Sequence, residues 1–441
     1  MNIVNRGFIR LFERYMPDPL VLAAILSIAV FIAGMVLNGV SPVGMSQGWY
    51  GGFFTLHGFA MQMILILVGG YALARSPAFG MVIDKIAVFA TTPERAIVLV
   101  TTCTLLACWV NWGVGLVAGA VLARELARKV IGVDYRVLIA AAYSSFILWH
   151  GGLSGSSTLL MATEGNFLQA AAGGVIPVSE TIFSALNLTL SAAVAVTIVM
   201  TFYLISRSIT EPVGIPASAL PPAEPEKASE DDGTPASRLE RSRLLGAVIG
   251  LAGLATIAVR FFQGGGLNLD AVIFILIFAG MLLHGSLGAY LKAVKEGVSG
   301  ATGVVIQFPF YAGIMGMMAS SGMSADLVRF FSEFATVQTL PFFTFLSAGL
   351  LNILVPSGGG QWAIQGPIAI ETAMALGASP ARSVVAFAWG DAWTNLIQPF
   401  WALPALAIAG LRAKDIMGFC ALALLTTGTV IGVILLIAGA L

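Results

Sequence analysis

The chain has 441 residues, of which 58% are hydrophobic and only 10% are charged, and its formal net charge is zero. Soluble domains carry about 25% charged residues, so this composition excludes a soluble globular protein, and the zero net charge excludes the overall basic field that attracts nucleic acid. Several apolar runs reach the roughly 20 residues that cross a bilayer as a helix. The composition predicts an all-α polytopic protein embedded in a lipid bilayer. Its cysteines all lie in apolar runs and predict buried thiols, with no disulfide framework or metal site: Cys103, Cys108 and Cys420.

The first half of the chain contains uninterrupted apolar runs and two interrupted ones. Residues 1–18 mix charged and apolar side chains and predict an amphipathic helix at the membrane surface. An apolar segment at 96–110 stops at Asn111-Trp112-Gly113 and resumes at 114–123; neither part reaches spanning length, which predicts a re-entrant hairpin. A later helix, from Val137, is broken by the polar, glycine-rich stretch 150–157. Uninterrupted spans are expected at 19–40, 57–75 and 182–205, with a short amphipathic piece at 79–90.

The second half follows a linker and shows the same kinds of break. Residues 207–243 are rich in Pro, Ala, Ser, Glu and Asp and predict a flexible connector. The apolar segment 340–355 is broken by Pro356 and three glycines before it resumes at 361–374, and a helix from Arg382 is interrupted around 391–399. In hydrocarbon such breaks persist only where protein or a watery cavity surrounds the freed backbone groups. Uninterrupted spans are expected at 244–262, 267–284, 301–320 and 416–441, with an amphipathic piece at 325–335.

A shift of 245 residues aligns the landmarks of the two halves. Asn111-Trp112-Gly113 falls on Pro356-Ser357-Gly358, and His150 falls on Asn395. Because one connecting helix lies between the halves, the alignment predicts two inverted-topology repeats, each with a re-entrant helical hairpin and a broken transmembrane helix, and about nine spans plus two hairpins in total. Repeats of this kind are typical of secondary transporters. We divide the chain into a first repeat (1–206), a cytoplasmic linker (207–243), a connecting helix (244–263) and a second, inverted repeat (264–441).

The distribution of lysine and arginine predicts the orientation. With the N-terminus inside, nineteen of the 22 basic residues fall on the cytoplasmic side, and only Arg260, Arg329 and Arg382 fall outside. Cytoplasmic loops carry the excess of basic residues in membrane proteins. The pattern therefore predicts a cytoplasmic N-terminus and an external C-terminus.

The breaks predict a binding site near the bilayer midplane. At each hairpin tip a helix begins, and its unpaired N–H groups and partial positive charge suit a carboxylate. Small apolar surroundings and nearby tryptophans, including Trp149 and Trp393, suit a short acyl chain. The residues that we assign to substrate binding are Asn111, Trp112, Gly113, His150, Ser154, Ser156, Ser357, Gly358, Gly359, Gly360, Gln361 and Trp362.

A second group of residues suits a coupling ion. Asp391 lies nine residues past Arg382, or about 13 Å along a helix at 1.5 Å per residue. An ionisable side chain at that depth is functional by default. Side-chain oxygens and freed carbonyls nearby suit a hard cation such as Na⁺. We assign ion coupling, by H⁺ or Na⁺, to Asp391, Thr394, Asn395 and Gln398, and we expect no cofactor and no other metal.

These residues also have purely structural interpretations, which the sequence leaves open. Asp391 would serve equally well in a structural ion pair, and His150 as a helix-end histidine with satisfied hydrogen bonds. The glycine run favours close packing, although packing does not explain Pro356 and Gln361 beside it. Gln62 and Gln307, which the shift superposes, suit hydrogen bonds between helices as well as a site.

With the tips and breaks in view, the chain resembles the bacterial short-chain fatty acid transporter family, which is associated with acetoacetate and butyrate uptake. The resemblance spans nearly the whole chain and is carried by W-V-N-W-G-V-G-L at 109–116, L-W-H-G-G-L-S-G-S at 148–156, V-P-S-G-G-G-Q-W at 355–362 and G-D-A-W-T-N-L-I-Q-P-F-W at 390–401. It implies co-transport of a monocarboxylate with H⁺ or Na⁺ across the bacterial cytoplasmic (inner) membrane. It also implies an elevator-type movement and a homodimer. The Ser-Asn-Thr signature of dicarboxylate relatives is absent, so their Na⁺ geometry does not transfer.

Two other classes of function remain open. A passive channel, facilitator or ion exchanger also fits a polytopic chain, although two opposed hairpins and an intramembrane acid favour alternating access. An enzyme is the remote alternative, because Gly152-Leu153-Ser154-Gly155 matches the G-x-S-G of rhomboid intramembrane proteases. A serine nucleophile needs a base within hydrogen-bond reach, and His150 lies on the same segment as Ser154. The inverted repeat has no role in that mechanism.

Overall fold

The fold is known from a computed structural model that describes residues 19–216 and 234–440. The surface helix expected at 1–18 and the middle of the linker lie outside the described residues. Within those ranges every regular element is a helix. Seven of the described helices are long and apolar enough to cross a membrane, which confirms the all-α polytopic membrane fold. They are α2 (Pro19–Asn38), α4 (His57–Ala74), α6 (Pro93–Val110), α10 (Ala185–Ser208), α12 (Arg243–Phe262), α15 (Thr302–Ser321) and α21 (Ala413–Ala440).

Shorter helices fill the intervals between these seven. In the first half they are α3 (Pro42–Phe53), α5 (Pro77–Ala87), α7 (Trp112–Lys129), α8 (Tyr135–Ser144), the 3-10 helix η1 (Ser145–Leu148) and α9 (Ser156–Met161). After α11 (Pro235–Glu240), the second half contains α13 (Leu269–His284), α14 (Leu287–Gly300), α16 (Met323–Phe334), α17 (Leu340–Leu354), α18 (Gly358–Leu376), α19 (Pro380–Asn395) and α20 (Pro399–Ala409).

The order of helices repeats at the expected shift of 245 residues. A shift of Pro42, the first residue of α3, gives Leu287, the first residue of α14. A shift of Tyr135, the first residue of α8, gives Pro380, the first residue of α19. The correspondence ends after α9 and α20, because the turns and irregular backbone at 162–184 precede α10 and have no long counterpart before α21. The inverted orientation of the second repeat stays a prediction.

One expectation about individual helices is wrong, and two helices were not expected. The parts of the first hairpin are not half-length, since α6 and α7 each have 18 residues. Thr92 caps α6, and Pro93 lies in its first turn. Helix α7 continues beyond the apolar run, through charged residues, and ends at Lys129. Hydropathy alone assigns those charged residues to a loop. The helices α3 and α14 were missed because their apolar runs are short. The signals that mark them are the caps Ser41 and Ser286, whose hydroxyls accept from Gly44 and Ala289 N–H groups.

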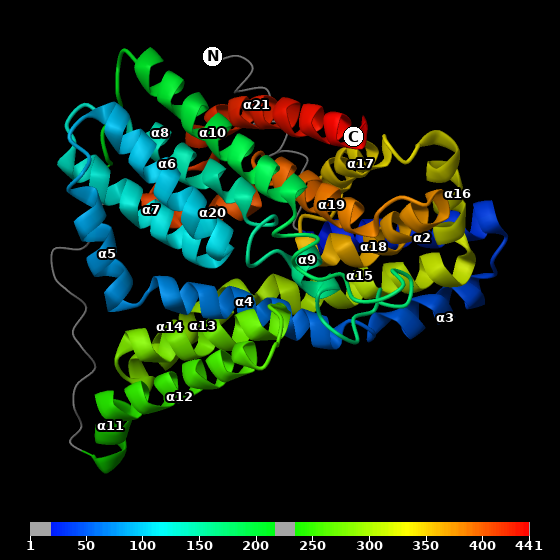
Figure 1. Ribbon diagram of the computed structural model, residues 1–441, viewed down its shortest axis with the longest axis horizontal. Coiled ribbons are helices and arrows are strands. Elements are labelled where there is room, and N and C mark those ends of the chain that lie inside the picture. Colours follow the sequence, from blue (N-terminus) through cyan, green and yellow to red (C-terminus); the bar gives the residue numbers. More distant parts are fainter. Residues whose placement is uncertain (1–18, 217–233, 441) are drawn as a thin grey trace.

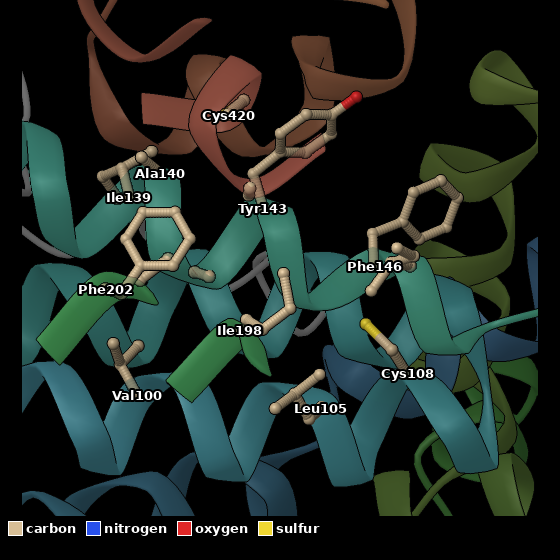
Figure 2. Packing of buried hydrophobic residues seen from close by; sticks show 14 of the residues in the cluster. Val100, Leu105, Cys108, Ile139, Ala140, Tyr143, Phe146, Ile198, Phe202 and Cys420 are labelled. Carbon is tan, nitrogen blue, oxygen red and sulfur yellow. The ribbon is translucent and has the colours of Figure 1, made fainter. Parts of the chain in front are cut away.

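The buried side chains form two large clusters. One cluster joins α6, α8, α10 and α21, and Figure 2 shows part of its packing. The second cluster joins α2, α4, α13, α15 and α18. In Figure 1, α10 and α21 cross the top of the molecule, α4 and α12 to α14 lie at the lower left, and α2, α3 and α15 lie at the right. Cys108 and Cys420 are free thiols buried in the first cluster, whereas free Cys103 is only half-buried.

Candidate functional site

Both predicted hairpin tips line one cavity of about 350 Å³. We call residues 111–113, where α6 ends and α7 begins, tip one, and residues 356–360, where α17 ends and α18 begins, tip two. Tip one contributes Trp112 and Gly113 to the cavity, and tip two contributes Pro356 and Ser357. The remaining wall comes from α4, α7, α14, α15 and α20: Leu67, Tyr71, Leu116, Val117, Glu296, Gly297, Ser299, Gly303, Val304, Gln307 and Trp401. Residues 245 positions apart in the sequence therefore meet on one surface.

Tip one is fixed by hydrogen bonds to side chains. Asn111 has extended backbone, and its Oδ1 accepts from the Val114 N–H (3.0 Å), so it caps α7. The Trp112 N–H donates to Ser154 Oγ (3.0 Å), and the Leu153 N–H donates to the Trp109 carbonyl (2.7 Å). The first helix break is thus bound to tip one. Asn111 is buried, and its Nδ2 has no partner among the described residues.

Tip two is fixed by a cap and by aromatic rings packed on glycines. Ser357 Oγ accepts from the Gly360 N–H (3.3 Å) and caps α18. A Cβ added at Gly358 would lie 2.6 Å from Trp149 Cη2, at Gly359 3.0 Å from Phe308 Cζ, and at Gly360 2.3 Å from Tyr311 Cδ2. A Cβ at Gly358 or Gly360 would force the neighbouring ring to shift, and one at Gly359 would make a tight contact, so close packing favours glycine at these positions.

The two helix breaks meet at a buried histidine–aspartate pair. His150 Nδ1 lies 2.8 Å from Asp391 Oδ2, and both side chains are fully buried. On the other edge of the ring, His150 Nε2 lies 3.0 Å from Ser156 Oγ and 3.0 Å from Ser157 Oγ, and it accepts from the Ser157 N–H (3.2 Å). Asp391 Oδ1 has no partner among the described residues. One member of this pair therefore comes from each half of the chain.

A network of amides surrounds the second break. The Trp149 Nε1–H donates to Asn395 Oδ1 (3.0 Å), and Asn395 Nδ2 lies 3.4 Å from Gln398 Oε1. Gln398 Nε2 donates to the Asn352 carbonyl (2.7 Å), and Asn352 Nδ2 donates to the Asp391 carbonyl (2.7 Å) and to Thr394 Oγ1 (2.9 Å). Asn352, on α17, was missed by the sequence analysis, although its position one turn before tip two in an apolar helix was an available signal.

The predicted site residues fall into three groups. Trp112, Gly113 and Ser357 line the cavity, with Asn111 and Gly358 adjacent to them in the chain. A fully buried layer joins the breaks: His150, Ser154, Ser156, Asp391, Thr394, Asn395 and Gln398. Gln361 and Trp362 are buried without lining the cavity, since Gln361 Nε2 donates to the Ala348 carbonyl (2.7 Å) and Trp362 packs on Phe387. Gly359 and Gly360 pack on rings as described above.

The cavity also contains residues that the sequence analysis did not assign to the site. Tyr71, Glu296 and Trp401 line it, and Trp401 lies edge to face with Trp112 at 5.5 Å between ring centroids. Gln307, weighed as an interhelical hydrogen-bonding residue, also lines it, whereas its counterpart Gln62 donates to Asp270 Oδ1 (2.6 Å). Glu296 accepts from Arg75 at 3.2 Å. Tyr71 and Glu296 were missed because they belong to the end of a span and to the unexpected helix α14.

Comparisons with known proteins agree with this architecture. The family model of the short chain fatty acid transporter matches residues 1–438. A protein of Escherichia coli K12 is 43% identical over 429 residues, and one of Haemophilus influenzae is 41% identical over 435 residues; each match covers 97% of both chains. Both are named short-chain fatty acid transporters, as provisional assignments. The crystal structure of the Alcanivorax borkumensis YdaH transporter, described as having an unusual topology, superposes with a TM-score of 0.56 at 16% identity and covers 95% of this chain and 98% of its own.

Proposed function

The chain belongs to the short-chain fatty acid transporter family, and we propose that it is a secondary active transporter of short-chain monocarboxylates such as butyrate or acetoacetate. We place it in the bacterial cytoplasmic membrane, with its N-terminus in the cytoplasm and its C-terminus outside. The family and the curated relatives favour transport over catalysis. The cargo of this chain, its coupling ion and its movement are the substance of the proposal.

The observation that carries the proposal is the single cavity between the two tips. Its volume of about 350 Å³ lies at the small end of ligand cavities. The first turns of α7 and α18 leave backbone N–H groups that the caps satisfy only in part, and these suit a carboxylate. Asn111 Nδ2 is a buried donor without a described partner, beside the lining residue Trp112. The rings of Trp112 and Trp401 would cover a short acyl chain.

We propose that the coupling cation, H⁺ or Na⁺, binds at Asp391. The carboxylate is fully buried, and one of its oxygens has no described partner. An uncompensated charge at that depth is costly, and a bound cation removes it. Moving the site through the membrane would cost less free energy when it holds both the carboxylate substrate and the cation than when it holds either alone. An elevator-type movement within a homodimer is the accompanying proposal, which rests on the family resemblance.

A hydrolase is the alternative for which the site offers a specific observation. Ser156, His150 and Asp391 follow the hydrogen-bond order of a serine–histidine–acid triad. However, Ser156 is buried, and a Cβ added at Gly358 would lie 3.0 Å from its Oγ. The backbone of tip two thus occupies the space that an acyl carbon would need. Ser154, the serine of the G-x-S-G match, instead accepts from the Trp112 N–H. The channel or exchanger alternative is left to the transport assay.

Uptake of radiolabelled butyrate into proteoliposomes tests the proposal, with a pH gradient and a Na⁺ gradient imposed separately. We expect accumulation above equilibrium under one of the two gradients, which identifies the coupling ion. Equilibration that ignores both gradients would indicate a channel or facilitator. Absence of butyrate entry, with the protein folded, would refute the substrate.

Asp391→Asn tests the assignment of the ion site in the same assay. The neutral amide keeps the shape of the side chain but binds neither a proton nor Na⁺ as a carboxylate does. We expect accumulation to be lost at unchanged expression. The matched control is Asp326→Asn, which removes an exposed carboxylate and should leave accumulation intact. Coupled uptake that survives in Asp391→Asn would refute the assignment.

A further inference from the structure

The donors around His150 determine which ring nitrogen carries the proton. The Ser157 backbone N–H lies 3.2 Å from Nε2, and a backbone N–H has no other role than donor. Nε2 must therefore offer its lone pair, with the hydroxyls of Ser156 and Ser157 as further neighbours at 3.0 Å. The ring proton is then on Nδ1, where Asp391 Oδ2 accepts it at 2.8 Å. His150 is thus a neutral imidazole in one tautomer, whose Nδ1–H points at a carboxylate.

The same contacts oppose a second proton on His150. A proton on Nε2 would face the Ser157 N–H, and that amide cannot turn away while α9 keeps its first turn. Asp391, in contrast, has a free oxygen, since Oδ1 has no partner among the described residues. Of the described titratable groups, only His150 acts on Asp391; the other side chains that touch the pair are uncharged, from Phe387 on α19, Trp149 before the first break and Ser156 and Ser157 on α9. Asn352 on α17 donates from Nδ2 to the Asp391 backbone carbonyl.

The His150 imidazole also contacts tip two. A Cβ added at Gly358 would lie 3.0 Å from His150 Cε1 and 3.0 Å from Ser156 Oγ, so the first residue of α18 lies directly on the ring and its serine partner. Gly358 follows Ser357, which lines the cavity. The His150 ring therefore contacts Asp391 through Nδ1, the start of α9 through Nε2, and tip two through Cε1.

We propose that His150 is a positioning residue that stays neutral and transmits the charge state of Asp391 to tip two. While Asp391 is ionised, the charge-assisted hydrogen bond to Nδ1–H holds the ring against Gly358. When Asp391 takes up a cation, that bond weakens, because hydrogen bonds to charged groups are the stronger ones, and the hydrogen bonds that then hold the ring among the described residues are those at Nε2, so the ring can shift against Gly358. This inference rests on the proposed function for its meaning in transport, but the state of the ring is testable without transport.

The first test reads the ring directly. The chain has only three histidines, so ¹⁵N-histidine labelling of the full-length protein in bilayers gives few signals, and the one lost in His150→Asn belongs to His150. We expect a neutral ring that is protonated at Nδ1, because the Ser157 N–H lies against Nε2. We also expect its Nδ1–H proton resonance to move upfield in Asp391→Asn. An imidazolium, or an Nε2–H tautomer, would overturn the proposal whether or not the protein moves butyrate.

The second test separates positioning from mere structural support. The amide of His150→Asn can replace the Nδ1–H donor, whereas His150→Ala cannot. We expect His150→Ala to lower the maximal uptake rate about tenfold to a hundredfold, the range for loss of a hydrogen bond to a charged group, and His150→Asn to recover most of it with the wild-type pH profile. An active His150→Asn variant whose uptake has lost the pH dependence of the wild type would show that the histidine itself carries the proton, and would refute the proposal.

A third measurement follows the signal to tip two. In a background without the native cysteines, Ser357→Cys reports access to the tip through its reaction with a water-soluble maleimide. We expect the labelling rate to change with pH or Na⁺, and this response to be lost when Asp391→Asn or His150→Ala is added. A response that survives in both double variants would refute the transmission through His150.

Discussion

Tip one and tip two lie 245 positions apart in the sequence and are held in different ways. At tip one, hydrogen bonds to Asn111 and Ser154 fix the backbone, and the partner serine belongs to the same half of the chain. At tip two, one serine cap is supplemented by rings that pack on three successive glycines. Those rings come from both halves: Trp149 before the first break, and Phe308 and Tyr311 on α15.

This difference bears on the proposed elevator-type movement. Directional hydrogen bonds bind tip one to its own repeat, so it is expected to travel with the first break as one unit. Ring-on-glycine contacts have no directional partner to break and can slide, provided that no side chain protrudes. Tip two also touches the His150–Asp391 pair through Gly358, so it is the tip placed to respond to the proposed ion site.

Among changes at the two tips, the largest effect is expected from filling the glycine contact at tip two. Gly360→Ala would place a Cβ 2.3 Å from Tyr311 Cδ2 inside a buried ring cluster. Overpacking of this kind costs about 1–3 kcal/mol and displaces the backbone. We expect at least a tenfold loss of butyrate uptake, roughly what 1.4 kcal/mol corresponds to, with a lower thermal midpoint in detergent.

The matched control lies at tip one. A Cβ added at Gly113 would have its nearest neighbours at 3.3–3.4 Å, so Gly113→Ala should be accommodated by small shifts, and the gain in helix propensity of up to about 1 kcal/mol offsets them. Equal losses in the two variants would refute the claim that close ring packing is particular to tip two.

The next effect concerns the caps. Asn111→Ala and Ser357→Ala each remove a side-chain acceptor from the first turn of a buried helix, at a cost of about 1 kcal/mol. Tip one keeps the Ser154 contact and should hold its shape, whereas tip two has no second side-chain hydrogen bond in the described structure. We therefore expect Ser357→Ala to raise the apparent KM for butyrate more than Asn111→Ala does, at a similar loss of stability. Urea or thermal unfolding gives the stability of each variant, and uptake kinetics give its KM. An equal rise in KM in the two variants would contradict the comparison.

The smallest effect is expected at the anchor of tip one. Ser154→Ala leaves the Trp112 N–H without its acceptor, at a cost near 1 kcal/mol. Combined with Asn111→Ala, the loss should exceed the sum of the single losses, because the two bonds fix adjacent residues. Additive losses in the unfolding free energy would show that the two bonds act independently. Ser156→Ala is not a suitable control, because the Ser156 hydroxyl contacts His150 Nε2.

Much of the arrangement was available from the sequence because its signals are local. The membrane class follows from composition, and the breaks follow from polar and glycine residues inside apolar runs. Tip residues Asn111 and Ser357 follow from the preference for such side chains before a helix. The repeat at 245 residues is a property of the sequence order, and it relates α3 to α14 even though neither short helix was expected. Hydropathy fails there because α3 and α14 have no long apolar run.

The tertiary structure decided which of these local features meet. His150 and Asp391 are separated by 241 positions, and nothing near either residue indicates the other; only the packing of the first break against α19 brings the ring to the carboxylate. The same packing places Gly358 on that ring, includes Glu296 and Trp401 in the cavity, and gives Asn352 its contacts with the second break. Cap and turn preferences act over a few residues and are written in the sequence, whereas contacts between helices depend on how two whole surfaces fit.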